Sequence, residues 1–119
     1  MKRDLDLVRE ILLAVEESSE PVEPPLEIEG YDLDLISYHV KLMEQADLIE
    51  AIYNEMRSGD IQVMSIRSLT WEGHEFLDAA RNETAWKEAK STAKDKGVNL
   101  TFRLMQKMLT SVLESILLS

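Results

Sequence analysis

The stretch between Tyr31 and Arg67 most constrains the fold, because one helical pattern passes directly into strand-like segments. Apolar residues recur at helical spacing over positions 33–46, which predicts an amphipathic helix that Asp32 is expected to cap. Asp47 follows, and aspartate tolerates the left-handed backbone conformation better than most residues other than glycine. The helix is therefore expected to stop sharply at this residue.

Two strand-like segments follow this central helix. Residues 48–53 are rich in isoleucine and leucine, and residues 61–67 alternate apolar and polar with one break at Val63 and Met64. Residues 56–60 between them contain Gly and Asp, which favour a tight turn. A helix that leads directly into a β-hairpin is the core of a winged helix-turn-helix. The sequence therefore predicts an α+β fold with a two- or three-stranded wing and additional C-terminal helices.

The residues before the central helix predict one further helix, over 4–17, because their apolar positions form a single stripe. An extended connection is expected over 19–25, where three prolines exclude a helix. Residues 26–28 alternate and are expected to add a third strand to the hairpin. The connection is short for a full extra helix, so an abbreviated helix-turn-helix is expected.

Helical patterns resume after the hairpin. Thr70 is a good N-cap for the next helix, and Trp71 is expected to staple that helix to the preceding strand. A new helix is expected over 85–96, with Thr84 as its cap and Gly97 as its stop. A last helix is expected to follow, so the pattern predicts three helices after the hairpin.

The charge of the chain is distributed unevenly. Residues 1–83, the predicted winged-helix domain, carry 7 basic and 20 acidic side chains, a net charge of −13. Residues 84–119, the predicted helical extension, carry 6 basic and 3 acidic side chains, a net charge of +3. This asymmetry indicates that the two parts face each other, another subunit or different partners. A solubilising acidic surface explains it equally well.

Three segments resemble, in order, a known family: MKRDLDLVREILLAVEE, ISYHVKLMEQADLIEA and IRSLTWEGHEFLDAARNETAWKEAK. The family is an uncharacterised bacterial and prophage-associated one, domain of unknown function 2513. The run LTWEGHEFLDAARNETAW is the most specific part of the resemblance. The resemblance implies a winged helix, since related regulators carry runs of the types SYHLKLLEEAGLI and LTEEGREFL. It implies no catalytic residue.

Enzymatic chemistry has no support in the residues. The chain has no cysteine, its four glycines are scattered, and His39 and His74 lack metal-ligand spacing. His39 beside the apolar stripe is expected to be a packing residue. We expect no enzyme, no cofactor and no metal site. The N-terminus is unlike a secretory signal, and no apolar stretch is long enough to span a bilayer, so a cytoplasmic protein without a membrane partner is expected.

Binding of double-stranded DNA, in the manner of a transcriptional regulator, is the function that the fold analogy predicts. In that interpretation Ser37, Tyr38 and Lys41 face bases or phosphates, and Arg57 and Arg67 contact DNA from the wing. The net charge of −10 opposes it, because capture of phosphates needs clustered cations. A row of lysines in the next-to-last helix would offset the repulsion only if it lies beside the central helix: Lys87, Lys90 and Lys94.

The alternative is a non-catalytic protein-interaction or dimerisation module that does not bind DNA. The last helix, expected to begin after Thr101, carries two adjacent apolar rows, which together are wider than packing on one helix requires. One row is expected to cover the core: Leu104, Met108, Val112 and Ile116. The other is expected to meet a second copy of the chain: Met105, Leu109, Leu113 and Leu117. Packing of the whole helix within one chain stays the competing interpretation.

Overall fold

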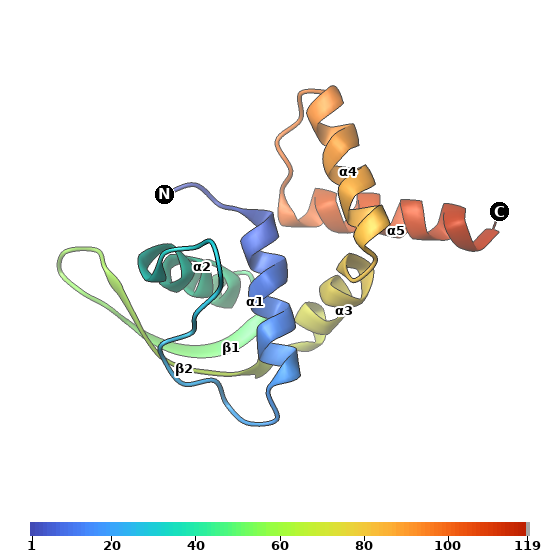
Figure 1. Cartoon of the computed structure of the whole chain (residues 1–119). Coiled ribbons are helices and arrows are strands. Elements are labelled where there is room, and N and C mark those ends of the chain that lie inside the picture. Colours follow the sequence, from blue (N-terminus) through green and yellow to red (C-terminus); the bar gives the residue numbers. More distant parts are fainter. Residues whose placement is uncertain (119) are drawn as a thin grey trace. The chain divides into compact units, whose positions relative to one another are not determined.

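The computed structural model describes residues 1–118 of the chain (Figure 1). Within them the predicted α+β class is confirmed, with five helices and one two-stranded antiparallel sheet. The elements in order are α1 (Leu5–Glu17), α2 (Leu33–Gln45), β1 (Ile49–Glu55), β2 (Ile61–Leu69), α3 (Trp71–Ala80), α4 (Glu83–Asp95) and α5 (Phe102–Leu118).

The chain divides into two compact units, which are described separately below. Unit 1 is Met1–His74 and unit 2 begins at Glu75. The boundary falls inside α3, earlier than the boundary after residue 83 that the sequence suggested. The reason is that the end of α3 carries Phe76, whose ring packs on aromatic rings of later helices.

Unit 1 is built on two amphipathic helices and the hairpin. The predicted first helix is confirmed: the Asp4 carboxylate caps α1 by accepting hydrogen bonds from the N–H groups of Asp6 and Leu7. Asp32 is the N-cap residue of α2, as predicted, but its carboxylate does not make the expected capping hydrogen bond. The apolar stripes of both helices are buried, together with residues of both strands: Leu7, Val8, Ile11, Leu12, Val15, Ile36, Val40, Met43, Leu48, Ile49, Ile66 and Leu69.

The turn from α2 into the hairpin follows the sequence prediction. Asp47 adopts a positive φ of 63°, and the next N–H, of Leu48, donates to the carbonyl of Met43 at 2.9 Å. The two strands then pair in antiparallel fashion. The ladder shifts register between Ile52 and Tyr53, where Met64 is the extra residue on β2. This is the place where the alternation of the sequence breaks.

The third strand expected over residues 26–28 is wrong. The extra pairing occurs earlier, at Val22, which exchanges backbone hydrogen bonds of 2.8 and 2.9 Å with Ile66 of β2. Pro24 and Pro25 follow and lack N–H groups, so the connection cannot continue a ladder beside β2. No helix lies between α1 and α2 in the described chain, which agrees with an abbreviated motif.

Hydrogen bonds from Thr70 join the start of α3 to the turn that follows α2: its N–H donates to the Leu48 carbonyl at 3.0 Å, and its hydroxyl also takes part. The Thr70 hydroxyl accepts from the Gly73 N–H at 3.0 Å, as predicted for a cap, and donates to the Asp47 carbonyl. A Cβ on Gly73 would overlap the carbonyl group of Leu48, so only glycine fits there. The expected staple is wrong, because the Trp71 side chain is 76% exposed.

Unit 2 is held by aromatic packing between helices. The Phe76 ring lies 4.4 Å from the Phe102 ring and 6.2 Å from the Trp86 ring, measured between centroids. The cap of α4 is Asn82, whose side chain accepts from the Ala85 N–H, and not the expected threonine at position 84. That helix therefore begins two residues earlier than predicted, at residue 83 rather than 85.

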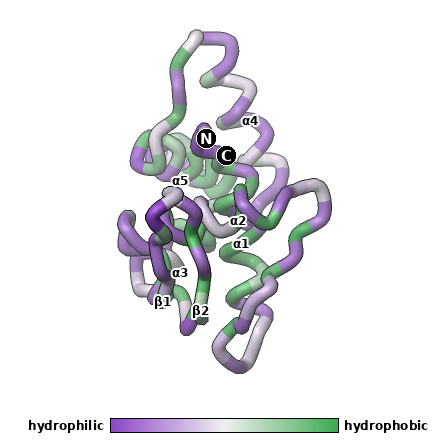
Figure 2. Tube along the Cα trace, turned by 90° about the vertical axis from the view of Figure 1, so that its left-hand side faces the viewer, coloured by the Kyte–Doolittle hydropathy of each residue, from purple (hydrophilic) through white to green (hydrophobic). Residues whose placement is uncertain are grey.

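The two long helices of unit 2 differ in polarity. Figure 2 shows mostly hydrophobic residues along α5 and mostly hydrophilic or intermediate residues along α4. Gly97 ends the α4 region with a positive φ of 66°, as predicted, and the Thr101 hydroxyl caps α5 by accepting from the Leu104 N–H.

Candidate interaction surface

The only lysine of α2 does not present a free charge. Lys41 Nζ lies 2.7 Å from Glu55 Oε1 on β1, where the two side chains form a hydrogen-bonded ion pair. The hydrogen bond to Glu55 raises the pKa of the Lys41 ammonium above its usual value. Contact with a DNA phosphate would compete with this carboxylate for the same cation.

The other two predicted contact residues of α2, Tyr38 and Ser37, have different surroundings. Tyr38 is half-buried, and its ring meets the ring of His39 edge to face at 5.9 Å. Ser37 is half-buried and lines an apolar groove. The three side chains share one helix, and of them Lys41 is engaged in an ion pair.

The two arginines predicted for the wing are not brought together. Arg57 is exposed in the hairpin turn, whereas Arg67 lies near the opposite end of β2. At about 3.3 Å per residue along a strand, the separation is on the order of 20–30 Å. Arg67 lines a second hollow with Val15 and His74. One DNA-contacting wing tip cannot contain both side chains.

His39 is fully buried, and both of its ring nitrogens have hydrogen-bond partners. Its Nε2 accepts the Asp4 N–H at 2.8 Å, and its Nδ1 lies 2.9 Å from the Leu35 carbonyl. This pattern fits a neutral ring that carries its proton on Nδ1. The packing role predicted for this histidine is confirmed. It joins the start of α1 to α2, which the sequence did not suggest.

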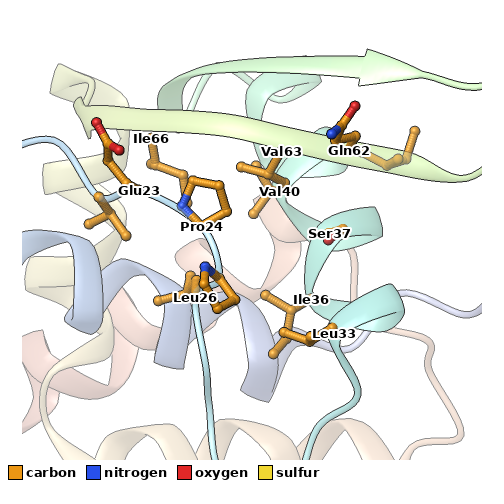
Figure 3. Close-up of a pocket in the computed structure, with 13 residues that line it drawn as sticks. Glu23, Pro24, Leu26, Leu33, Ile36, Ser37, Val40, Gln62, Val63 and Ile66 are labelled. Atoms are coloured by element: carbon orange, nitrogen blue, oxygen red, sulfur yellow. The ribbon is translucent and has the colours of Figure 1, made fainter.

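An apolar groove in unit 1 is a feature that the sequence did not reveal. It has a volume of about 230 Å³ and lies between the proline connection, the first half of α2 and β2. Figure 3 shows Pro24 and Leu26 on one side and Leu33 and Ile36 on the other, with Val63 of β2 near them. The full lining is Val22, Glu23, Pro24, Pro25, Leu26, Leu33, Ile36, Ser37, Val40, Ile61, Gln62, Val63 and Ile66.

The groove is apolar inside and acidic around its walls. Glu23 is the one charged residue in the lining. The segments that form the walls carry further exposed carboxylates: Glu20, Glu27, Glu29, Asp32 and Asp34. Unit 1 as a whole, residues 1–74, has 6 basic and 17 acidic side chains, a net charge of −11. The surface favours cations and repels phosphates.

The predicted lysine row lies on the exposed side of α4 in unit 2, opposite the buried Ala89 and Ala93. Lys87 pairs with Glu83 one turn earlier, at 3.9 Å. An exposed pair of this kind contributes little to stability. The row is therefore a solvated helix face within its own unit.

The row predicted as a dimer contact on α5 splits into buried and exposed members. Met105 and Leu109 are fully buried within the chain, so they cannot meet a second copy in this conformation. Leu113 is half-buried, and Leu117 is 81% exposed. The exposed apolar surface of α5 lies instead at Leu104 and over residues 116–118.

The comparisons with known proteins give the family. The chain matches the model of the family "Hypothetical protein (DUF2513)" over residues 2–99. The chain belongs to this family. It is also 39% identical, over 98% of its own length and 99% of the other chain, to a Haemophilus influenzae protein described as "Uncharacterized protein". The resemblance found in the sequence is thus confirmed.

The family match ends before α5 begins, whereas the similarity to the Haemophilus protein covers nearly the whole chain. No solved structure matches the chain significantly. Among the helices of residues 1–118, none is long and apolar enough to cross a membrane.

Proposed function

We propose that this DUF2513 chain is a non-catalytic interaction module in which a winged-helix-like unit 1 binds a protein instead of DNA. The order of α1, the Val22 bridge, α2 and a β-hairpin supports a winged helix with an abbreviated helix-turn-helix. In this proposal the surface around α2 is the binding face, as it is in a DNA-binding winged helix, but its side chains suit a protein partner.

The observation that carries the proposal is the state of the α2 surface. Its only lysine is paired with Glu55, and an apolar groove opens beside Ser37, where a DNA-binding helix would present polar side chains to bases. Exposed apolar patches rimmed by polar residues are typical of protein-binding sites. The net charge of −11 on unit 1 adds repulsion for any duplex that approaches.

The competing function is that of a DNA-binding regulator, and only the fold analogy supports it. Fluorescence anisotropy with a labelled random-sequence duplex, at low and at moderate salt, separates the two functions. The proposal expects no binding at low salt, and no change when Lys41 is replaced by glutamate. Salt-dependent binding that Lys41→Glu abolishes would favour the regulator and contradict the proposal.

A second copy as the partner remains a prediction with a revised contact. The exposed apolar residues of α5 that could meet a copy are Leu104, Ile116, Leu117 and Leu118. Sedimentation of the wild type beside Leu117→Glu tests it. A dimer that this exposed substitution dissociates is expected if α5 is the contact. A wild type that is monomeric at high concentration removes the dimer from the proposal.

A further inference from the structure

We infer that the groove of unit 1 binds an extended segment of a partner protein that carries apolar side chains flanked by lysine or arginine, and that this segment adds alongside β2. The inference rests on the proposed function, because it names the partner that the interaction module recognises. It depends on three independent features of the groove: its size, the free edge of β2, and the charge of its walls.

The size of the groove suits side chains more than a separate small molecule. Pockets for drug-sized ligands usually measure about 300–1,000 Å³, and this groove has a volume of about 230 Å³. Apart from Glu23, Ser37 and Gln62 its lining residues are apolar, and one of them, Leu33, is 51% exposed. One or two aliphatic side chains entering between α2 and the proline connection would cover this surface.

The edge of β2 next to the groove is a template for another strand. On the side opposite β1, β2 pairs with Val22 at Ile66, and over residues 61–63 no described segment pairs with it. The connection bends away from β2 at Pro24, which leaves this part of the edge open (Figure 3). An extended segment could continue the ladder that Val22 begins. Backbone hydrogen bonds would then give affinity, and the groove would select alternate side chains.

The charge of the walls selects the partner's flanking residues. Glu23 lines the groove, and the connection and the start of α2, which both contribute lining residues, carry further exposed carboxylates: Glu20, Glu27, Glu29, Asp32 and Asp34. Lysine or arginine beside the apolar side chains would complement these groups and speed the encounter. The chain's own α5 fits poorly as the occupant. It is helical, and beyond Lys107 its only charged residue is Glu114.

The experiment uses the full chain and four short fluorescein-labelled peptides of equal length, read by fluorescence anisotropy. The first alternates lysine with isoleucine and valine. The second has glutamate in place of lysine, and the third has serine in place of isoleucine and valine. The fourth repeats the first with alternate backbone nitrogens methylated, which removes the donors needed for strand addition. A labelled random-sequence DNA duplex is titrated in the same buffer.

Two substitutions test the groove, each with a matched control. Ser37→Phe fills the groove from α2, and its control Ser91→Phe places the same ring on the exposed face of α4. Glu23→Lys reverses a charge at the groove, and its control Glu50→Lys makes the same change at an exposed position of β1. Glu23 is exposed, so its replacement is expected to leave the fold intact even if Ser37→Phe does not.

The expected result is that the first peptide binds and the other three bind at least about tenfold more weakly, as loss of the apolar or charged contacts implies. Ser37→Phe and Glu23→Lys should each weaken the first peptide about tenfold or more, and the two controls less than about threefold. Equal binding of all four peptides, no peptide binding, or equal effects of the controls would overturn the inference. Binding of the duplex would instead overturn the proposed function, so the two failures are distinguishable.

Discussion

Unit 1 is held largely by contacts between residues far apart in the sequence, whereas unit 2 is held by helices that follow one another. In unit 1, Val22 pairs with Ile66, and the Asp4 N–H reaches His39. In unit 2, one cluster of aromatic rings around Phe76 joins α3, α4 and α5. Both units bury apolar side chains, but unit 1 adds hydrogen bonds between distant parts of the chain.

The units also differ in charge. Unit 1 has a net charge of −11, and unit 2, with 7 basic and 6 acidic side chains from residue 75 onward, has a net charge of +1. The acidic charge therefore accompanies the hairpin and the apolar groove, and is not spread over the chain. Under the proposed function, this difference means that the charge of unit 1 opposes the approach of a DNA duplex more than the charge of unit 2 does. The predictions below test how far the two units differ.

Phe76→Ala is expected to have the largest effect, because the ring is fully buried at the centre of unit 2. Truncation of a buried phenylalanine usually costs about 3–5 kcal/mol of unfolding free energy. Urea unfolding measures the loss, and amide hydrogen exchange should show it in α4 and α5. The exposed neighbour Glu75, replaced by alanine, should change stability by less than about 0.5 kcal/mol. A mild effect of Phe76→Ala would mean that unit 2 does not depend on this cluster.

Gly73→Ala tests whether the two units respond separately. It changes the same helix as Phe76→Ala, three residues earlier, but at a position that belongs to unit 1. The new Cβ would overlap the Leu48 carbonyl group, so backbone must shift where the hairpin leaves α2. Overpacking of this kind costs about 1–3 kcal/mol or more. Hydrogen exchange is expected to rise in β1 and β2 before it rises in α4. Loss of protection first in α4 would contradict the division of α3 between the units.

His39→Leu removes a polar side chain from the core of unit 1 without changing its size greatly. The Asp4 N–H would lose its acceptor at the start of α1, and an unsatisfied amide costs about 1–3 kcal/mol. Urea unfolding of this variant beside His74→Leu, which alters an exposed histidine, provides the measurement. Equal stabilities of the two variants would show that the hydrogen bond from Asp4 contributes nothing.

The smallest expected effect is a loss of stability at alkaline pH, and it follows from the burial of Tyr31 and from the carboxylates near it. Burial, followed by the charges of Asp4, Asp6 and Glu10, raises the pKa of the Tyr31 phenol above its usual 10.0. A raised folded pKa contributes stability that is complete below the usual value and is lost as the pH rises through the folded value. The wild type should therefore lose Tm above pH 10 relative to Tyr31→Phe, while their difference stays constant near neutral pH. A difference that is constant at all pH values would contradict it.

Most elements were predictable because their signals are local. The stripes of α1 and α2 follow from helical spacing, and Asp47 follows from its tolerance of a positive φ. The irregularity of the hairpin near Met64 appears in the sequence as a broken alternation. Each of these features depends on a few neighbouring residues, so it needs no knowledge of the tertiary structure.

The features that escaped prediction depend on contacts across the chain. The extra pairing lies at Val22 and not at residues 26–28, because prolines decide where a ladder must end. The exposure of Trp71 and the burial of Met105 depend on which face of each helix is turned toward the core. The two adjacent apolar rows of α5 do not specify which of them is buried. The groove was missed for the same reason: its walls come from three separate segments.

The central claim is that the surface around α2 binds protein and not DNA. The most direct test is a titration of isotope-labelled protein with a random-sequence duplex at low salt, followed by amide chemical shifts in NMR spectra. Under the proposed function, no salt-dependent change is expected at the residues that a DNA-binding winged helix would use: Ser37, Tyr38, Lys41, Arg57 and Arg67. Saturable shifts at Ser37 and Lys41 that disappear at moderate salt would contradict it.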